Sequence, residues 1–258
     1  MAHRVSKHFF ASAIIFFLIF FGLAIALSTA GAPAHTLVSV DNAIIAWIAP
    51  LRTSPLLAQS MVVITYLGNP EIIIALEIAL LVFILLAHRK KIAILFLGGI
   101  VGGEILSLVF KHLLARNRPE EILFHVSRVG FAFPSGHALL GTIFYGSLGL
   151  FAAHLATKKL HKKLIVIATA LIIFLVGFSR IYLGVHWFSD VVGGWALGLS
   201  VLSLIAVVFY TIHHHKTTET LRSVSKKEKT AIIVVSCMTL FYIVYFYVTH
   251  LSTIRSIV

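Results

Sequence analysis

Two side chains in the stretch SRIYLGVHWFSD, residues 179–190, are of types that could carry out chemistry together. His186 and Asp190 are four positions apart, so at the start of a helix they would share one face and lie within reach of each other. An aspartate that accepts a hydrogen bond from one imidazole nitrogen fixes the tautomer and leaves the other nitrogen as a nucleophile. A plain helix-surface pair has the same spacing, so the location of the stretch decides between the two interpretations.

The stretch lies between two apolar runs, LIVIATALIIFLVGF before it and VVGGWALGLSVLSLIAVVF after it. Ionisable groups close to hydrocarbon cost several kcal/mol unless they pair or face water, so those found there are functional candidates by default. Arg180, His186 and Asp190 are therefore predicted to belong to a site at a membrane face.

A second stretch, PSGH at residues 134–137, directly precedes another apolar run. Pro134 and Gly136 break the chain, and Ser135 is a candidate N-cap, at a helix start whose free N–H groups would bind phosphate well. His137 would lie at the mouth of this helix, where it could donate a proton to a leaving oxygen. An ordinary turn with an interfacial histidine is the simpler alternative.

A third stretch, KHLLARNRP at residues 111–119, ends a further apolar run. Guanidinium groups bind phosphate oxygens through paired hydrogen bonds and lysine acts as a mobile point charge, so Lys111 and Arg118 are candidates for phosphate binding. A solvated basic loop is the alternative. Arg116 and Arg128 fit that alternative equally well and are not assigned to the site.

Apolar side chains dominate the composition, with 59% hydrophobic and only 12% charged residues. A soluble domain is roughly half apolar and a quarter charged, so an integral membrane protein is predicted. The net charge of +12 is accounted for by basic cytoplasmic loops, and no nucleic-acid partner is expected. The single cysteine, Cys237, excludes an internal disulfide and a multi-cysteine metal site.

Seven apolar segments reach, or nearly reach, the roughly 20 residues that cross a bilayer. They are residues 9–30, 69–87, 92–114, 137–156, 164–183, 187–211 and 231–249. The first resembles a signal peptide, but it is longer than a usual signal core and is interpreted as an anchored helix. The semi-polar stretch 36–67 is predicted to form short helices at the interface. The predicted fold class is an all-α transmembrane bundle.

The distribution of Lys and Arg predicts the orientation. Four clusters, before the first segment and after the second, fourth and sixth, contain 14 of the 21 basic residues. Alternating spans place all four clusters on one side, which the positive-inside rule makes the cytoplasm. Four of the other seven basic residues lie within 111–128, and Arg180 closes the fifth segment on the same outer face. This external positive cluster indicates an anionic ligand, most simply a lipid phosphate.

The three stretches together resemble the signature of the type 2 phosphatidic acid phosphatase superfamily. K-x6-R-P at 111–119, P-S-G-H at 134–137 and S-R-x5-H-x3-D at 179–190 match it at eleven positions in the right order. With the surrounding layout of six helices the resemblance extends over roughly 1–212, which we take as the core. Residues 213–230 are predicted to be a basic cytoplasmic linker, and residues 231–258 an additional C-terminal transmembrane helix.

The resemblance implies a role for each motif residue, and it implies that neither a metal nor a cofactor takes part. His186 would attack phosphorus and form a phosphohistidine, with Asp190 orienting it. His137 would protonate the leaving group and then activate water. Phosphate oxygens would be held by Lys111, Arg118, Ser135, Gly136 and Arg180.

The function expected from this resemblance is hydrolysis of a lipid phosphate or diphosphate at the outer face of a prokaryotic-type inner membrane. The candidate substrates are undecaprenyl diphosphate, phosphatidylglycerophosphate, phosphatidate and lipid A phosphates, with the first two favoured. A phosphotransferase with a hydroxyl acceptor is the enzymatic alternative, and the seven spans count against a haloperoxidase-like activity. A non-enzymatic lipid transporter or scaffold is the remaining alternative, favoured only by the intramembrane residues Glu77 and Glu104. The oligomeric state is left open.

Overall fold

The computed structural model describes residues 2–29, 31–86, 88–119, 130–214 and 238–249, which are mostly helical and contain no strand. Their main elements, in chain order, are α1 (Ala2–Ser28), α2 (Ala32–Ile48), the 3-10 turn η1 (Ala49–Thr53), α3 (Pro55–Tyr66), α4 (Pro70–Leu86), α5 (Lys90–Leu114), α6 (Gly136–Leu155), α7 (Lys159–Tyr182) and α8 (Phe188–His214). A shorter apolar helix covers Met238–Thr249. The all-α fold class predicted from the sequence is confirmed.

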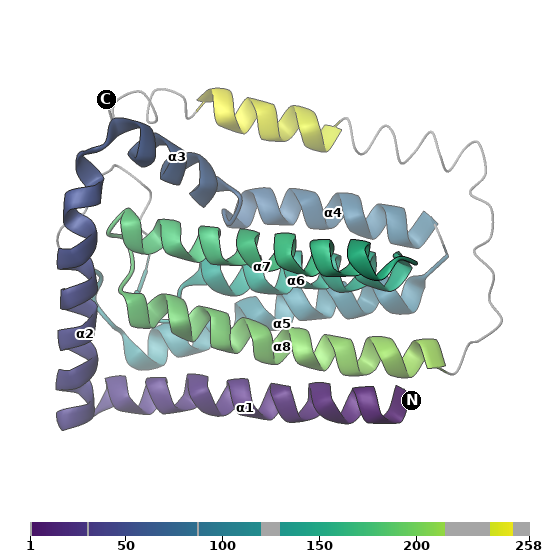
Figure 1. Cartoon of the computed structure of the whole chain (residues 1–258), viewed down its shortest axis with the longest axis horizontal. Coiled ribbons are helices and arrows are strands. Elements are labelled where there is room, and N and C mark those ends of the chain that lie inside the picture. Colours follow the sequence, from purple (N-terminus) through teal and green to yellow (C-terminus); the bar gives the residue numbers. More distant parts are fainter. Residues whose placement is uncertain (1, 30, 87, 120–129, 215–237, 250–258) are drawn as a thin grey trace.

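Six of the predicted spans correspond to α1, α4, α5, α6, α7 and α8, which run along a common direction as one bundle (Figure 1). Helix α6 is central, because it packs against α4, α5, α7 and α8, while α1 lies along α8. Of the predicted span 231–249, only the part within Met238–Thr249 is described, and the rest lies outside the described residues. The division of the chain at 212 and 230 stays a prediction.

The stretch predicted to form interfacial helices folds as α2, η1 and α3. Helix α2 runs across one end of the bundle rather than along it (Figure 1), which fits a helix at the membrane surface. The segment Ala32–Thr53 is also long and apolar enough to span a membrane, but its direction separates it from the bundle helices. Helix α3 then leads into α4 through a bend of 46°.

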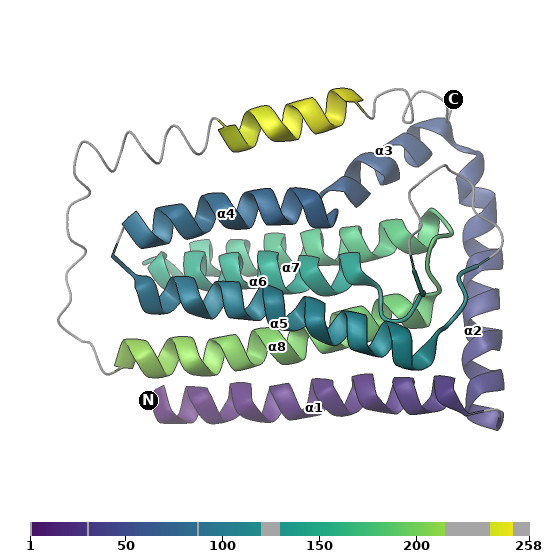
Figure 2. The ribbon, with the colours of Figure 1, turned by 180° about the vertical axis from the view of Figure 1, so that it is seen from behind.

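The two ends of the bundle differ in character (Figure 2). One end contains the start of α1 and the α4–α5 and α6–α7 connections, with the described basic residues Lys7, Arg89, Lys90, Lys91, Lys158, Lys159, Lys162 and Lys163. The other end contains the end of α5, the start of α6 and the turn between α7 and α8, where the three motif stretches lie. The fourth basic cluster, residues 216–229, lies outside the described residues.

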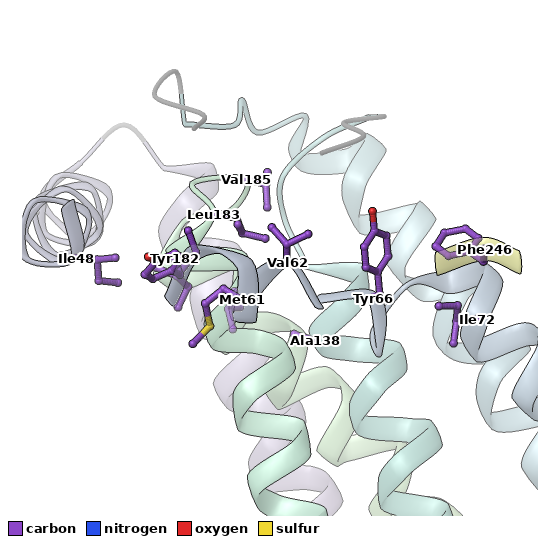
Figure 3. Close-up of a cluster of buried hydrophobic side chains, with 13 residues drawn as sticks. Ile48, Met61, Val62, Tyr66, Ile72, Ala138, Tyr182, Leu183, Val185 and Phe246 are labelled. Carbon is purple, nitrogen blue, oxygen red and sulfur yellow. The ribbon is translucent and has the colours of Figure 1, made fainter. Parts of the chain in front are cut away.

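A cluster of buried apolar side chains supports the turn between α7 and α8 (Figure 3). Tyr182, Leu183 and Val185 are fully buried there against Met61 and Val62 of α3. Gly184 adopts a φ of +69°, a left-handed conformation that other residues rarely adopt, and so permits the turn. The cluster therefore fixes the backbone on both sides of Gly184, directly before His186.

Gly194 of α8 allows α6 to approach closely. A Cβ atom at this position would lie 2.6 Å from the carbonyl oxygen of Ser135 and 2.9 Å from the Cβ atom of Ala138. Small residues at such crossings let helix backbones come together in a membrane, where apolar burial gives little drive for helix association. The distance between the PSGH stretch and α8 therefore depends on the absence of a side chain at Gly194.

We expect Gly194→Ala to destabilise the protein by about 1–3 kcal/mol, because the added methyl group overpacks the contact between α6 and α8. Gly98→Ala is the matched control, since a Cβ atom at Gly98 of α5 would have no neighbour within 4 Å. The melting temperature of each purified variant in detergent measures the effect. Equal melting temperatures for Gly194→Ala and Gly98→Ala would contradict the close-packing argument.

Candidate active site

His186 and Asp190 meet at the beginning of α8, as their spacing predicts. His186 lies in the turn just before the helix, and its Nδ1 is 3.5 Å from Oδ2 of Asp190. The same Oδ2 accepts a hydrogen bond of 2.9 Å from the backbone N–H of Trp187, which holds the carboxylate over the start of the helix. Both side chains are buried, and Nδ1 of His186 has no hydrogen-bond partner among the described residues.

Arg118 lies on the other side of the imidazole. Its NH1 group is 3.2 Å from Nε2 of His186 and donates a hydrogen bond of 2.8 Å to the carbonyl oxygen of Val185. Its Nε donates to the carbonyl oxygen of Gly130 at 3.0 Å. The guanidinium is thus fixed by two segments of backbone, directly beside the imidazole nitrogen that faces away from Asp190.

Arg180 and Ser135 each have a buried polar atom without a hydrogen-bond partner among the described residues. Arg180 is 2% exposed and donates from NH1 to the hydroxyl of Thr65 at 2.7 Å, but its Nε has no hydrogen-bond partner within the described part of the chain. The hydroxyl of Ser135 is fully buried and equally unpartnered there. Buried polar groups are nearly always hydrogen-bonded, so these atoms indicate a ligand rich in acceptors.

Helix α6 begins directly after Ser135, which occupies the N-cap position but makes no side-chain capping bond. The backbone N–H of Ser135 instead donates to the carbonyl oxygen of Asp190 at 3.0 Å, which joins the PSGH stretch to α8. Gly136 and His137 form the first turn of α6 and are half-buried. The free N–H groups of such a turn can bind an anion.

Positive charge converges on the imidazole of His186. Lys111, in the last turn of α5, donates to the carbonyl oxygen of Phe131 at 2.9 Å. Burial, together with the charges of Arg180, Arg118 and Lys111, lowers the pKa of His186 well below its ordinary value. The imidazole is therefore neutral near pH 7, as a nucleophile must be. His137 lies close enough to all four residues to interact with their charges.

Arg116, which the sequence analysis did not assign to the site, is the centre of a polar network. Its NH1 contacts Oδ1 of Asp190 at 2.5 Å and the hydroxyl of Ser189 at 2.7 Å, and its guanidinium lies 5.6 Å from the centroid of the Trp187 ring. Its NH2 donates to Oδ2 of Asp41 at 2.7 Å. The sequence left a solvated loop and a binding role equally open for Arg116, because Asp41, Ser189 and Asp190 are all far from it in the sequence.

Asp41 of α2 was missed by the sequence analysis. It is 1% exposed and accepts bonds from the backbone N–H of Ser189 at 2.8 Å and from its hydroxyl at 2.6 Å. An isolated acidic residue in the apolar run LVSVDNAIIAWI carries the same signal that drew attention to Glu77 and Glu104. That signal would have found Asp41, although not its partners.

The remaining candidates lie outside this group. Arg128 is not among the described residues. Glu77 is 4% exposed, and its Oε1 has no hydrogen-bond partner within the described ranges, while Glu104 is half-buried and its charge acts on Lys111. Among the described residues, no group of three or more His, Cys, Asp or Glu side chains is arranged to hold a metal ion.

The eight predicted site residues therefore converge at one end of the bundle, and comparison with known proteins relates this arrangement to a family. Residues 92–214 match the family model of the PAP2 superfamily. Phosphatidylglycerophosphatase B of Bacillus subtilis is 34% identical over 191 residues, which cover 73% of this chain and 90% of that protein. Undecaprenyl-diphosphatase of Sulfolobus acidocaldarius is 32% identical over 152 residues, covering 57% of this chain and 68% of that protein.

A solved structure agrees with these relatives. The crystal structure of a transmembrane PAP2 type phosphatidylglycerolphosphate phosphatase from Bacillus subtilis superposes with a TM-score of 0.68 and 31% identity, covering 78% of this chain and 97% of that one. The sequence and the fold match those of these relatives, and the three motif stretches converge in this structure. This chain therefore belongs to the PAP2 superfamily and is a membrane phosphatase.

Proposed function

We propose that this protein hydrolyses a lipid phosphate or diphosphate through a phosphohistidine on His186, with phosphatidylglycerophosphate and undecaprenyl diphosphate as the preferred substrates. The relatives described above are named for these two substrates. The observation that carries the proposal is that Ser135 and Arg180, at the same end of the bundle as His186, keep buried polar atoms without a hydrogen-bond partner among the described residues. Phosphate oxygens would satisfy these atoms, and phosphorus would then lie next to the nucleophile.

The first proposed step is attack of His186 Nε2 on phosphorus. The N–P bond forms while the bond from phosphorus to the leaving oxygen breaks, and His137 gives its proton to that oxygen. Asp190 holds the imidazole through Nδ1 and stabilises the positive charge that develops on it. Arg118, Arg180, Lys111, the hydroxyl of Ser135 and the N–H of Gly136 stabilise the non-bridging oxygens, so the charge is spread over donors that are already in place.

In the second proposed step, His137 takes a proton from water as that water attacks phosphorus. The N–P bond breaks, inorganic phosphate leaves, and His186 returns to its neutral form. A lipid hydroxyl in place of water would give phosphotransfer instead. Water is the simpler acceptor because it needs no second lipid site. The reaction as proposed uses no metal and no cofactor.

We expect His186→Ala to lower phosphate release from a panel of purified lipid phosphates by at least ~10³-fold, because the nucleophile is lost. His137→Ala should lower it by ~10²–10⁴-fold, the usual contribution of a general acid. Free phosphate and phosphorylated lipid products are measured together, so that hydrolysis and phosphotransfer are separated. His112→Ala is the matched control, an exposed histidine next to Lys111, and should retain full activity.

The leaving group provides a sharper test of His137. An aryl phosphate needs little protonation of its leaving oxygen, so it should still phosphorylate His186 in the His137→Ala variant. Hydrolysis of that phosphohistidine should then be slow, because His137 no longer activates water. Labelled phosphate should then accumulate on the protein in an acid-labile, base-stable form, as expected for phosphohistidine, and should be absent from His186→Ala. Normal turnover by both variants would refute the proposed mechanism.

We propose that the site faces the outside of the cytoplasmic membrane, with the N-terminus inside. The support is the separation of the motif end from the basic end of the bundle, to which the positive-inside rule applies. The substrate would be bound with its phosphate in the external pocket and its tail in the bilayer.

A cysteine-accessibility experiment tests this orientation. In a background of Cys237→Ala, Asn117→Cys at the motif end should react with a membrane-impermeant thiol reagent added to intact cells. Thr157→Cys, in the α6–α7 connection, should react only after the membrane is opened. Both native side chains are exposed, so the two positions form a matched pair. The reverse pattern would overturn the proposed topology.

A further inference from the structure

Helix α2 has an unusual pattern of burial. Its only buried residues are Asp41 and Ile48, while apolar side chains such as Val38, Val40 and Trp47 are exposed. A helix that only rested on the bundle end would bury apolar residues and expose its acidic one. The burial of Asp41 therefore indicates a specific polar docking contact.

Both carboxylate oxygens of Asp41 contact the start of α8. Oδ1 accepts from the backbone N–H of Ser189, and Oδ2 accepts from the hydroxyl of the same residue. The backbone N–H groups in the first turn of a helix have no intrahelical partner, so Asp41 acts as a cap supplied by a different helix. Oδ2 also binds Arg116, and the contact thus extends beyond capping.

The guanidinium of Arg116 is divided between two carboxylates. NH2 contacts Asp41 while NH1 contacts Oδ1 of Asp190, the oxygen that does not face His186. With Oδ1 held there, Oδ2 accepts a hydrogen bond from Trp187 and lies 3.5 Å from Nδ1 of His186, within ion-pair distance. The chain of contacts from Asp41 through Arg116 and Asp190 to His186 is continuous and almost entirely buried.

We propose that Asp41 is a positioning residue for phosphoryl transfer, which acts through Arg116 and Asp190 to hold the imidazole of His186 in its reactive orientation. The proposal rests on the function proposed above, since it assigns Asp41 to the same reaction. The side-chain contacts that the structure describes for Asp41 are with Ser189 and Arg116, so its contribution is indirect. The planar guanidinium of Arg116 is held by Asp41 on one side and Asp190 on the other, which fixes the orientation of Asp190. Without Asp41, the guanidinium can rotate.

One consequence concerns α2 as a whole. Because Asp41 is the main polar contact of this helix, the chemistry depends on the docking of α2 across the bundle end. A helix that lies along the membrane surface is thereby connected to the nucleophile.

The test compares Asp41→Asn with wild type by single-turnover labelling and by steady-state phosphate release. Asparagine has the same shape but presents an amide N–H where the network needs an acceptor. The rate of phosphohistidine formation and kcat should fall by about 10–100-fold, the usual effect of losing an outer hydrogen-bond partner, with KM within about twofold. Asn42→Ala, next along α2 and exposed, is the matched control and should be unchanged.

A double substitution separates positioning from simple stabilisation. If Asp41 acts through Asp190, then adding Asp41→Asn to Asp190→Asn should produce no further loss in the labelling rate. Arg116→Lys, which keeps the charge but loses the fork, should reproduce the effect of Asp41→Asn and serves as a second variant should Asp41→Asn fail to fold.

Two outcomes would overturn the proposal. The first is a kcat of wild-type size in Asp41→Asn or in Arg116→Lys. The second is a loss from Asp41→Asn that is just as large in the Asp190→Asn background. If either result occurs while His186→Ala is inactive, only the role of Asp41 is refuted. If His186→Ala is active, the proposed function itself is refuted.

Discussion

The guanidinium of Arg116 binds two buried carboxylates at once, and the arrangement of this end of the bundle depends on it. Asp41 comes from α2, Arg116 from the segment after α5, and Asp190 from the first turn of α8. A buried charge without its partner is strongly destabilising, so these three elements are held in one relative arrangement. The proposed nucleophile lies directly beside this arrangement, since Oδ2 of Asp190 is 3.5 Å from His186.

Apolar packing determines where this polar network lies. The buried cluster around Tyr182 and Val185 fixes the turn before α8, and Gly194 lets the PSGH stretch approach the same helix. Within the site, Ser135 and Arg180 retain buried polar atoms without a partner among the described residues. Such atoms are costly unless a ligand satisfies them, and an oxyanion matches their chemistry. The fold thus prepares donors in advance, which is how electrostatic catalysis avoids reorganisation during the reaction.

The membrane explains why the site is at an end of the bundle rather than in its middle. A phosphate group carries charge and remains near water, whereas the tail of its lipid stays in hydrocarbon. A pocket at the bundle end can contact both. Many large apolar side chains along the helices are exposed, as expected for contact with lipid, and the basic residues of the α4–α5 and α6–α7 connections lie at the opposite end. The helical core is shared with the solved relative, which superposes over 78% of the chain.

The sequence by itself determined the membrane class and six of the bundle helices, with ends within seven residues of those observed, and it predicted the eight motif residues that converge at one end. These features are local: hydropathy is summed over a helix length, and the three motifs consist of residues close together in the chain. The tertiary structure alone decided that Arg116 binds both Asp190 and Asp41. Asp41 and Arg116 are 75 positions apart, and Arg116 and Asp190 are 74 apart. No local pattern records such pairings, because a buried ion pair forms only when packing brings distant segments together and removes them from water.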